Sequence, residues 1–289
     1  MNILVIGGTR LMGKHLVEQL LSEGHRVTIA TRGETIDHFA DTVNRIKFDR
    51  LEEDSIKKNL AGRHYDVVYD SLNYCSNDTR QLLEHISCDR YIMISTIAVY
   101  EFHPNTKESD FDPMTKELIW CDRDAYPYGE IKRQAECALF QQYHNVKPIA
   151  VRFPLVIGED DYTKRFYFYV EHILRQIPMY VDNYEAKIPF ISSKEAGQFL
   201  AWLSTTDYVG PINGACEGTI SIKEIAEYIE EKTGKVPILS SEGEAAPYNG
   251  PSDYSINTEL ANRLGFQFSS IKTWIYSLID QLIKEVGEV

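Results

Sequence analysis

The chain has 289 residues, is 43% hydrophobic and carries a formal net charge of -13 at pH 7. This length suits one large α/β domain or a domain with a smaller partner, and the acidic excess disfavours non-specific binding to nucleic acid or anionic lipid. The five cysteines form no C-x-x-C pair, no basic signal leader is visible, and no apolar stretch approaches the ~20 residues of a membrane span. We therefore expect a cytoplasmic protein with reduced thiols, no metal site and no membrane partner.

The chain opens on a strand, a glycine turn and a helix. Residues 2–6 are a short apolar run of the kind that is buried on both faces of a parallel sheet, and Gly7 and Gly8 end it. From Leu11 the apolar residues recur at helical spacing until Gly24. Because a glycine turn before a helix aims backbone N–H groups and the positive helix end at one point, this stretch predicts a phosphate-binding turn.

Four more apolar strands follow, with helical stretches between them. They are expected at residues 26–30, 44–48, 66–69 and 90–95. This alternation predicts an α/β fold with a Rossmann-type doubly wound parallel sheet, which binds ligands outside the carboxyl ends of its strands. The residues that directly follow the strands are therefore candidate binding residues: Thr31 and Arg32, Asp49 and Arg50, and Ser71, Leu72 and Asn73.

Beyond residue 158 the pattern becomes mainly helical. An aromatic-rich helix is expected over residues 165–173 and a final helix over residues 271–286. The Ser-x-x-Glu sequences at 192–195 and 221–224 have the spacing of a capping box, so each predicts a helix start. Several side chains of this half could either wall a pocket or pack inside the lobe: Tyr162, Arg165, Phe166, Tyr167, Tyr169 and Tyr184.

This change of pattern divides the chain into two parts. Residues 1–157 are predicted to form the doubly wound domain. Residues 158–289 are predicted to form mainly a smaller C-terminal α/β substrate lobe, with residues 188–215 returning to the first domain.

One pair of side chains has the spacing for proton transfer. Tyr128 and Lys132 lie four residues apart, on one helix face, and Pro127 suits the helix start. A free tyrosine has a pKa of ~10, which is high for a proton carrier at neutral pH, and a nearby ammonium lowers that pKa. The fifth strand ends in Ser95 and Thr96, where a hydroxyl can bond the same substrate oxygen.

The same spacing occurs in two other tyrosine–lysine pairs. Tyr143 and Lys147 run into Pro148, where a helix must end. Tyr228 and Lys232 lie in the middle of a helix, far from any sheet turn. Both pairs are interpreted as surface side chains.

Six segments together resemble the extended short-chain dehydrogenase/reductases, the NAD(P)-dependent epimerase/dehydratase family. They are GGTRLMG (7–13), STIAVY (95–100), YGEIK (128–132), VRFPLVIG (151–158), PFISSKEAG (189–197) and DYSINTELANRLG (253–265), so the resemblance runs nearly end to end. The GGTR form of the turn is similar to a subgroup described only as epimerase or reductase. Two positions depart from the family pattern, because Arg10 replaces the middle glycine and Glu195 stands where aspartate is usual.

The resemblance implies a role for each motif residue. Thr96 would orient the substrate, Tyr128 would be the acid/base, and Lys132 would lower the pKa of Tyr128 and hold the nicotinamide ribose. Hydride would move between a substrate carbon and the nicotinamide. The implied cofactor-binding residues are Gly7, Thr9, Arg10, Leu11, Met12, Gly13, Thr31, Arg32, Asp49, Arg50, Ser71, Leu72, Asn73, Tyr128, Lys132, Phe153 and Val156.

The residues after the second strand bear on the choice of cofactor. Members that prefer NAD usually place an acid there to bind the adenosine ribose, whereas this chain has Thr31 followed by Arg32. An arginine pairs with a 2′-phosphate, often bidentately, and Arg10 adds a second positive charge. We predict NADP(H), with NAD(H) as the alternative.

The reaction stays open between two kinds. Dehydratases of the family carry an Asp-Glu pair directly after the catalytic threonine, and Ile97 and Ala98 in those positions disfavour 4,6-dehydration. Reduction and epimerisation both remain, on a carbonyl or secondary alcohol of a nucleotide-sugar-like or small carbonyl substrate. By analogy with the family the protein would be a homodimer.

Two further interpretations are weighed against an enzyme. Some plant proteins that look like the GGTR subgroup bind RNA, but the low basicity of this chain argues against a nucleic-acid partner. A catalytically idle NADP(H) sensor has no need of a proton carrier, so the intact Thr96, Tyr128 and Lys132 argue against it.

Overall fold

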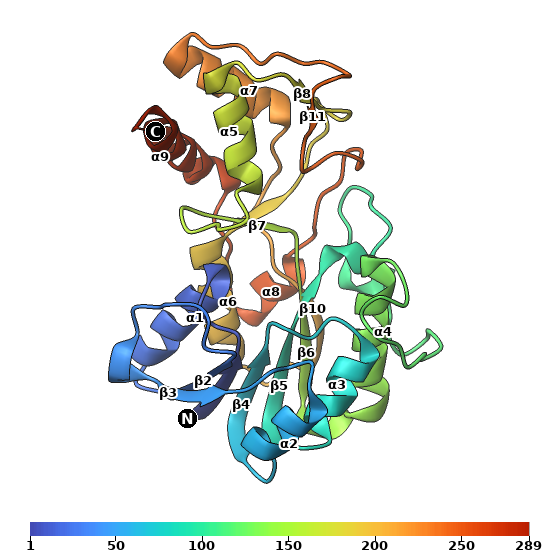
Figure 1. Ribbon diagram of the computed structural model, residues 1–289. Coiled ribbons are helices and arrows are strands. Elements are labelled where there is room, and N and C mark those ends of the chain that lie inside the picture. Colours follow the sequence, from blue (N-terminus) through green and yellow to red (C-terminus); the bar gives the residue numbers. More distant parts are fainter. Residues whose placement is uncertain (289) are drawn as a thin grey trace.

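A parallel sheet forms the centre of the protein (Figure 1). In the computed structural model, which describes residues 1–288, seven strands pair in the order β10-β6-β5-β4-β1-β2-β3, and each neighbouring pair is parallel. This order reverses between β1 and β4, which confirms the predicted Rossmann-type doubly wound fold. The strands are β1 (Asn2–Ile6), β2 (Arg26–Thr31), β3 (Asn44–Lys47), β4 (His64–Asp70), β5 (Ser87–Thr96), β6 (Pro148–Phe153) and β10 (Gly210–Asn213).

The strand register gathers the predicted binding segments at one edge of the sheet. Ile6 of β1 lies opposite Ala30 of β2 and Asp70 of β4. The central strand is buried along its length after Asn2, which is why its sequence is continuously apolar rather than alternating. The turns that follow these three strands therefore meet at the point where the strand order reverses.

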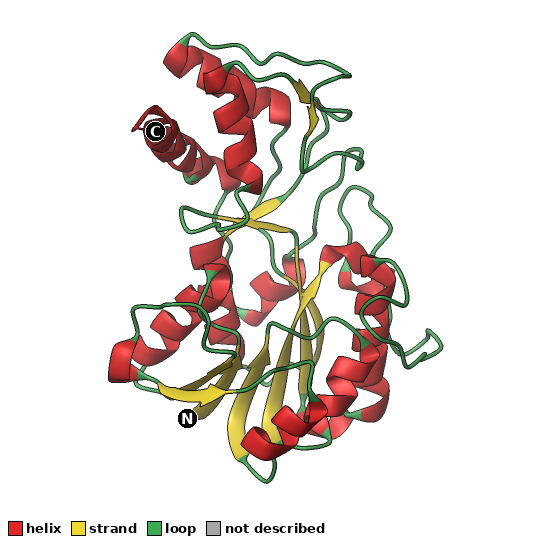
Figure 2. Ribbon diagram, in the orientation of Figure 1, coloured by secondary structure: helices red, strands yellow, loops and turns green. Residues whose placement is uncertain are grey.

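Helices cover both faces of the sheet (Figures 1 and 2). One face carries α1 (Leu11–Ser22) and α6 (Ser193–Leu203), and the other carries α2 (Glu53–Leu60), α3 (Ser76–Leu83) and α4 (Tyr128–Gln142). The first pair packs closely, because a Cβ at Gly197 would lie 2.6 Å from the backbone nitrogen of Leu16. Thus α6, although late in the chain, is part of the sheet body.

A second lobe lies beyond the carboxyl ends of the strands (Figure 1). It contains α5 (Arg165–Arg175), α7 (Ile222–Thr233), α9 (Ile275–Glu288) and the short parallel pair β8 (Met179–Tyr180) and β11 (Glu244–Ala245). Between the lobe and the sheet, β7 (Leu155–Ile157) pairs with β9 (Phe190–Ser192), and α8 (Glu259–Leu264) returns to the side of β10. None of the helices in residues 1–288 combines the length and apolar character needed to cross a bilayer.

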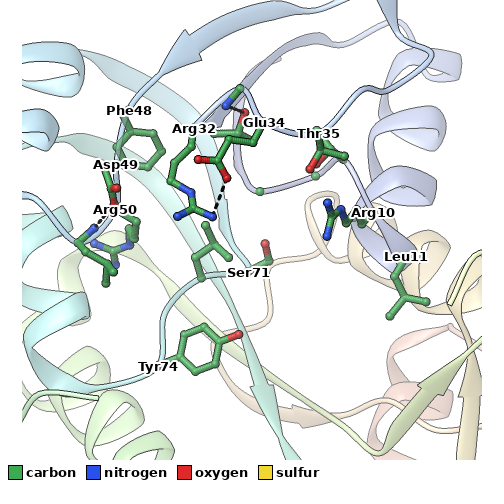
Figure 3. Close-up of a pocket in the computed structure, with 18 of the residues that line it drawn as sticks. Arg10, Leu11, Arg32, Glu34, Thr35, Phe48, Asp49, Arg50, Ser71 and Tyr74 are labelled. Carbon is green, nitrogen blue, oxygen red and sulfur yellow. Dashed lines mark hydrogen bonds and ion pairs between the residues drawn. The ribbon is translucent and has the colours of Figure 1, made fainter. Parts of the chain in front are cut away.

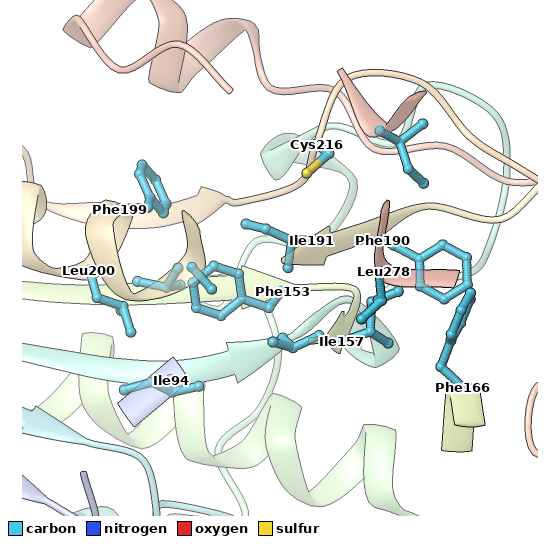
Figure 4. Packing of buried hydrophobic residues seen from close by; sticks show 14 of the residues in the cluster. Ile94, Phe153, Ile157, Phe166, Phe190, Ile191, Phe199, Leu200, Cys216 and Leu278 are labelled. Atoms are coloured by element: carbon cyan, nitrogen blue, oxygen red, sulfur yellow. The ribbon is translucent and has the colours of Figure 1, made fainter. Parts of the chain in front are cut away.

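One hydrophobic core joins the two parts (Figure 4). At the sheet end, Phe153 packs edge-on against Phe199 of α6, with 6.3 Å between ring centroids. At the lobe end, Phe190 of β9 packs edge-on against Phe166 of α5 at 5.8 Å. Because such aromatic pairs add to the stabilisation from burial, the β7–β9 pair connects the lobe and the sheet through packed side chains as well as through the chain.

The capping signals and the last helix differ in part from expectation. Ser221 and Glu224 form the expected reciprocal capping box. At the other signal Ser192 accepts a bond from the Glu195 N–H, but the Glu195 carboxylate turns to the N–H and hydroxyl of Ser269, so only half of the box forms. The final helix begins at Ile275 rather than at residue 271, because residues 271–273 form a separate 3₁₀ turn.

A buried ion pair anchors the long connection between β5 and α4. Arg152 and Glu136 are both fully buried and joined by hydrogen bonds from the guanidinium, one of them 3.1 Å from Nε to Oε1. The same guanidinium donates to the Tyr100 hydroxyl and to the carbonyls of Glu108 and Phe111. These bonds hold residues 101–127 against the end of the sheet.

We expect an Arg152→Met variant to lose ~3–5 kcal/mol of unfolding free energy, because it leaves the Glu136 carboxylate buried without its partner. Urea unfolding followed by circular dichroism measures the change. A double variant, Arg152→Met with Glu136→Met, should lose less than the single variant. Equal losses in the two proteins would contradict this account of the pair.

Candidate active site

A groove of about 490 Å³ runs along the edge of the sheet where the turns after β1, β2, β3 and β4 meet (Figure 3). It contains most of the residues predicted to bind a cofactor: Gly7, Thr9, Arg10, Leu11, Met12, Gly13, Thr31, Arg32, Asp49, Arg50, Ser71 and Leu72. Glu34, Thr35, Tyr74, Arg123 and Tyr162 also line it and were not in the predicted cofactor set. The groove therefore lies at the ligand-binding position of a doubly wound sheet.

The glycine turn is built to admit a phosphate. Gly7 and Gly8 have φ of 93° and 84°, which L side chains rarely adopt. A Cβ at Gly13 would lie 2.8 Å from the Cα of Gly8, so α1 begins directly against the turn. Arg10, at the N-cap, makes no side-chain cap bond. Gly13 donates its N–H to the Arg10 carbonyl, so the N–H groups of Leu11 and Met12 are those left to an anion.

Arg32 and Glu34 form an ion pair on the rim of the groove (Figure 3). The guanidinium lies 3.0 Å from the carboxylate, and both side chains are exposed. Arg10 points elsewhere, because its guanidinium lies 4.8 Å from the ring centroid of Tyr162. The two arginines expected to act together on a 2′-phosphate thus have different partners.

Arg50 lines the groove but is buried beneath it. It is 3% exposed and donates to a carboxylate oxygen of Asp70 at 2.9 Å and to the Asp78 carbonyl at 2.6 Å. Its guanidinium therefore holds the turns after β3 and β4 together, while Asp49 beside it is the more open of the two predicted residues.

A second cleft, of about 460 Å³, opens between the sheet and the lobe. All the remaining predicted residues except Asn73 line it: Thr96, Tyr128, Lys132, Phe153 and Val156. The groove and the cleft are continuous, since both are lined by Leu11, Met12, Ser71, Tyr74 and Tyr162.

Gly129 brings the tyrosine to the threonine. A Cβ at this position would lie 2.4 Å from the Ala98 carbonyl oxygen, so only glycine lets α4 begin against the turn after Thr96. Tyr128 is 49% exposed. Partial shielding by the surrounding protein raises the pKa of Tyr128, which Tyr74 raises further and which the Thr96 hydroxyl and the Arg165 guanidinium lower.

Lys132 lies deeper than its partner tyrosine. It is 3% exposed and donates to the carbonyl oxygens of Asn73 at 2.6 Å and Ile94 at 2.7 Å. Burial lowers the pKa of Lys132 to about 8, although the charge of Glu136 acts to raise that pKa. Lys132 is not among the groups that shift the pKa of Tyr128 here, so its role in lowering that pKa stays a prediction.

Asn73 is placed differently from its prediction. Its side chain is fully buried and donates to Thr79 Oγ1 at 2.9 Å and to the Tyr91 hydroxyl at 3.1 Å. It lines neither the groove nor the cleft. A short polar residue after a strand can turn into the protein as easily as out of it, and the hydroxyls beneath this turn draw the amide inward.

The expected aromatic pocket wall is only partly present. Tyr162 and Arg165 line the cleft. Phe166, Tyr167 and Tyr169 are buried in the core of the lobe, and Tyr184 packs against that core. In their place the cleft uses residues that sequence reasoning missed: Tyr74, Phe102, Tyr248, Asn249 and Tyr254. These residues come from three separate loops, and of them only Tyr254 lies in a segment that carries the family resemblance, residues 253–265.

Tyr74 and Arg123 form a cover where groove and cleft meet. The Arg123 guanidinium lies 4.6 Å from the Tyr74 ring centroid and donates to Asp78 and to the Leu72 carbonyl. The ring of Tyr74 lies 6.4 Å from that of Tyr128. Residues 101–127 thus contribute a cation to the site that their polar sequence did not suggest.

A glycine turn at a bare helix end, continuous with a Thr–Tyr–Lys cleft, defines a dinucleotide-binding fold of the short-chain dehydrogenase/reductase type. The pattern of the NAD dependent epimerase/dehydratase family matches residues 3–211, and the chain belongs to that family. The family inferred from the motifs is thereby confirmed, while the GGTR subgroup stays a prediction.

Several solved structures share the whole fold. MoeE5 in complex with UDP-glucose and NAD is 20% identical with a TM-score of 0.75, over 100% of this chain and 99% of that chain. UDP-glucuronic acid 4-epimerase from Bacillus cereus, in complex with NAD, is 18% identical with a TM-score of 0.69, over 98% and 100%. Vestitone reductase from alfalfa (Medicago sativa) is 17% identical with a TM-score of 0.67, over 99% of both chains. At these identities the likeness is one of fold.

A curated relative matches part of the chain. The chloroplast stem-loop binding protein of 41 kDa b from Arabidopsis thaliana is 34% identical over 131 residues. The match covers 39% of this chain and 35% of that protein, so it spans about a third of the relative's length.

The buried Lys132 predicts a pH-dependent contribution to stability. Because the pKa of Lys132 is lowered to about 8 on folding, the unfolded chain binds its proton more tightly between about pH 8 and 10.5. The unfolding free energy of the wild type minus that of Lys132→Met should therefore rise by ~2 kcal/mol from pH 7 to pH 10. Urea unfolding of both proteins at each pH measures it, and a difference that stays flat would contradict the lowered pKa.

Proposed function

We propose that this protein is an NAD(P)-dependent oxidoreductase or epimerase that acts on a carbonyl or secondary alcohol. The observation that carries the proposal is the continuity of the glycine-turn groove with the cleft of Thr96, Tyr128 and Lys132. A dinucleotide whose phosphates bind at the turn would extend along the groove toward the proton carrier. This arrangement supports an enzyme over an idle sensor.

The groove fits such a cofactor. The start of α1 would bind the pyrophosphate, and Asp49 would lie along the adenine. Tyr128 and Lys132 would hold the nicotinamide ribose, with Phe153 and Val156 beside the nicotinamide. When bound, the cofactor supplies the hydride donor or acceptor.

Tyr128 is the proton carrier of the proposed reaction. Its raised pKa keeps the phenol protonated at neutral pH, as donation to a carbonyl oxygen requires. The Thr96 hydroxyl, which accepts a bond from the Ala98 N–H at 3.2 Å, can donate its own hydrogen to the same substrate oxygen. Reduction and epimerisation both use this step, whereas Ile97 and Ala98 offer no acid or base for dehydration.

A Tyr128→Phe variant should lose at least ~100-fold in turnover, because the proton carrier is removed. Its NADP+ and NAD+ dissociation constants should stay within about twofold, because Lys132 and the groove still bind the cofactor. Fluorescence titration and a screen of nucleotide sugars and small carbonyls supply the measurements. Tyr143→Phe, at the far end of α4, is the matched control and should behave as the wild type. Unchanged turnover in Tyr128→Phe would refute the assigned role.

The preference for NADP(H) over NAD(H) also belongs to the proposal. Arg32 supports it, because its guanidinium lies on the groove and can exchange Glu34 for a 2′-phosphate. Glu34 works in the opposite direction, since its carboxylate lies on the same rim and could accept hydrogen bonds from an unphosphorylated ribose. The balance between these two side chains sets the preference.

We expect Arg32→Gln to weaken NADP+ binding about tenfold and NAD+ binding less than twofold. Glu34→Gln should strengthen NADP+ binding several-fold, because it frees Arg32 and removes a like charge from the phosphate. Calorimetric titration of both cofactors measures these changes. The same titration of an Arg10→Gly variant measures how much Arg10 contributes to NADP+ binding. Tighter binding of NAD+ than of NADP+ by the wild type would overturn the preference.

RNA binding is the second candidate function. Arg26, Arg45 and Arg63 line a hollow of about 480 Å³ at the amino end of the sheet, opposite the groove. A cluster of arginines suits phosphate contacts, although Arg45 is already paired with Asp37. A salt-dependent gel shift that is lost in an Arg26→Gln, Arg63→Gln double variant would support this function over the enzyme.

The remaining parts of the proposal concern setting and assembly. The five cysteines are buried and free, which supports a reducing, cytoplasmic compartment. A small-molecule substrate and a homodimer complete the proposal, the dimer by analogy with the family alone.

A further inference from the structure

The charge of the substrate cleft is opposite to that of the whole chain. The protein carries a net charge of -13, yet of the described residues that line the cleft only Lys132 and Arg165 carry charge. Lys132 is already committed to two backbone carbonyls. The cleft therefore offers one available cation, Arg165, and no carboxylate to pair with it.

Arg165 is held in place without losing its charge to a partner. It is the first residue of α5, and its Nε donates to Thr163 Oγ1 at 3.2 Å. The neighbouring Asp161 carboxylate accepts from the N–H and hydroxyl of Thr163 instead. Among residues 1–288 no carboxylate lies within ion-pair distance of Arg165, whereas Arg175 at the other end of α5 is paired with Glu171 at 3.5 Å.

A second polar group in the cleft lacks a partner. Tyr248 is 4% exposed, lines the cleft, and its hydroxyl is buried without a hydrogen bond to any described residue. Stacking on Tyr169, at 5.5 Å between ring centroids, and edge-on packing against Phe190 fix the ring. A buried hydroxyl left unpaired costs ~1–3 kcal/mol, so its presence in the same cleft as a guanidinium with no carboxylate partner points to a ligand.

We propose that the substrate carries an anionic group, a carboxylate or a phosphate, that binds between Arg165 and the Tyr248 hydroxyl. This inference rests on the proposed function and names its substrate class: a carbonyl compound or secondary alcohol with one acidic group. The reacting carbon would lie at Thr96 and Tyr128, which line the same cleft. A single guanidinium matches one such group, because it binds two oxygens of one acid through parallel hydrogen bonds.

The anion also acts on the proton carrier. The Arg165 guanidinium lowers the pKa of both Tyr128 and Tyr248. An anion on Arg165 offsets this effect, so Tyr128 holds its proton more firmly when an acidic substrate is bound. Binding of the acidic group thus favours the protonated phenol that reduction of a carbonyl needs.

Calorimetric titration, with and without saturating NADP+, tests the site. The anionic probes are glucuronate, glucose 6-phosphate and 3-hydroxybutyrate, and the neutral probes are glucose and 1,3-butanediol. We expect saturable binding of at least one anionic probe and at least tenfold weaker binding of its neutral counterpart. Comparing glucuronate with glucose 6-phosphate decides between carboxylate and phosphate.

The variants separate a built site from general attraction. Arg165→Gln should weaken the anionic probe at least tenfold, and Tyr248→Phe about threefold, without changing the binding of a neutral probe. Arg175→Gln is the matched control and should bind as the wild type does. Equal binding of charged and neutral probes, no binding of any anionic probe, or an unchanged Arg165→Gln variant would each overturn the inference.

The same titration distinguishes this inference from the proposed reaction. If anion binding depends on Arg165 but none of the probes is turned over, the result supports the anion site and contradicts only the proposed reaction. Turnover of charged and neutral probes alike by Arg165→Gln supports the reaction and overturns the site.

Discussion

The burial of the Lys132 ammonium between two backbone carbonyls is the constraint on which the active site depends. An ammonium removed from water must be compensated, and here the carbonyl of Asn73, in the turn after β4, and that of Ile94, in β5, compensate it. Because Lys132 is fixed by this turn and by β5, the rotation of α4 about its axis is fixed as well. Tyr128, one helical turn earlier, then has to face the cleft.

Two small features make that placement sterically possible. Gly129 lets the first turn of α4 touch the Ala98 carbonyl, and Gly13 lets α1 touch the glycine turn in the same way. Both helices therefore begin in direct contact with a strand end. The start of α1 faces the groove and the start of α4 faces the cleft, so one packing rule produces both the anion-binding turn and the position of the phenol.

The features that the sequence predicts well are those whose cause is local. A buried parallel strand requires a continuous apolar run, and a turn into a helix requires glycine where a Cβ would collide, so β1, α1 and the turn between them follow from residues 2–22 alone. The Tyr128 and Lys132 spacing is local too. The function of this spacing cannot be inferred locally, because two other tyrosine–lysine pairs have the same spacing. Only the strand that ends at Thr96 distinguishes the Tyr128 and Lys132 pair from them.

The features that could not be predicted from the sequence depend on contacts between residues that are distant along the chain. Whether Asn73 turns outward depends on Thr79 and on the Tyr91 hydroxyl from the next strand. Glu195 has the capping spacing, yet a backbone N–H at Ser269 draws it away. Arg165 and Tyr248 line the same cleft although 83 positions separate them in the numbering. The residue pattern of neither segment predicts that they share a cleft.

Net charge misleads for the same reason. The total of -13 sums exposed carboxylates over the whole surface, and salt at physiological strength screens them beyond ~8 Å. Inside the cleft, low-dielectric walls strengthen the field of the few charges that line it, and those are Lys132 and Arg165. An acidic protein can therefore present a cationic active site, provided that its carboxylates stay outside the cleft or, like Asp161, bond to their own loop.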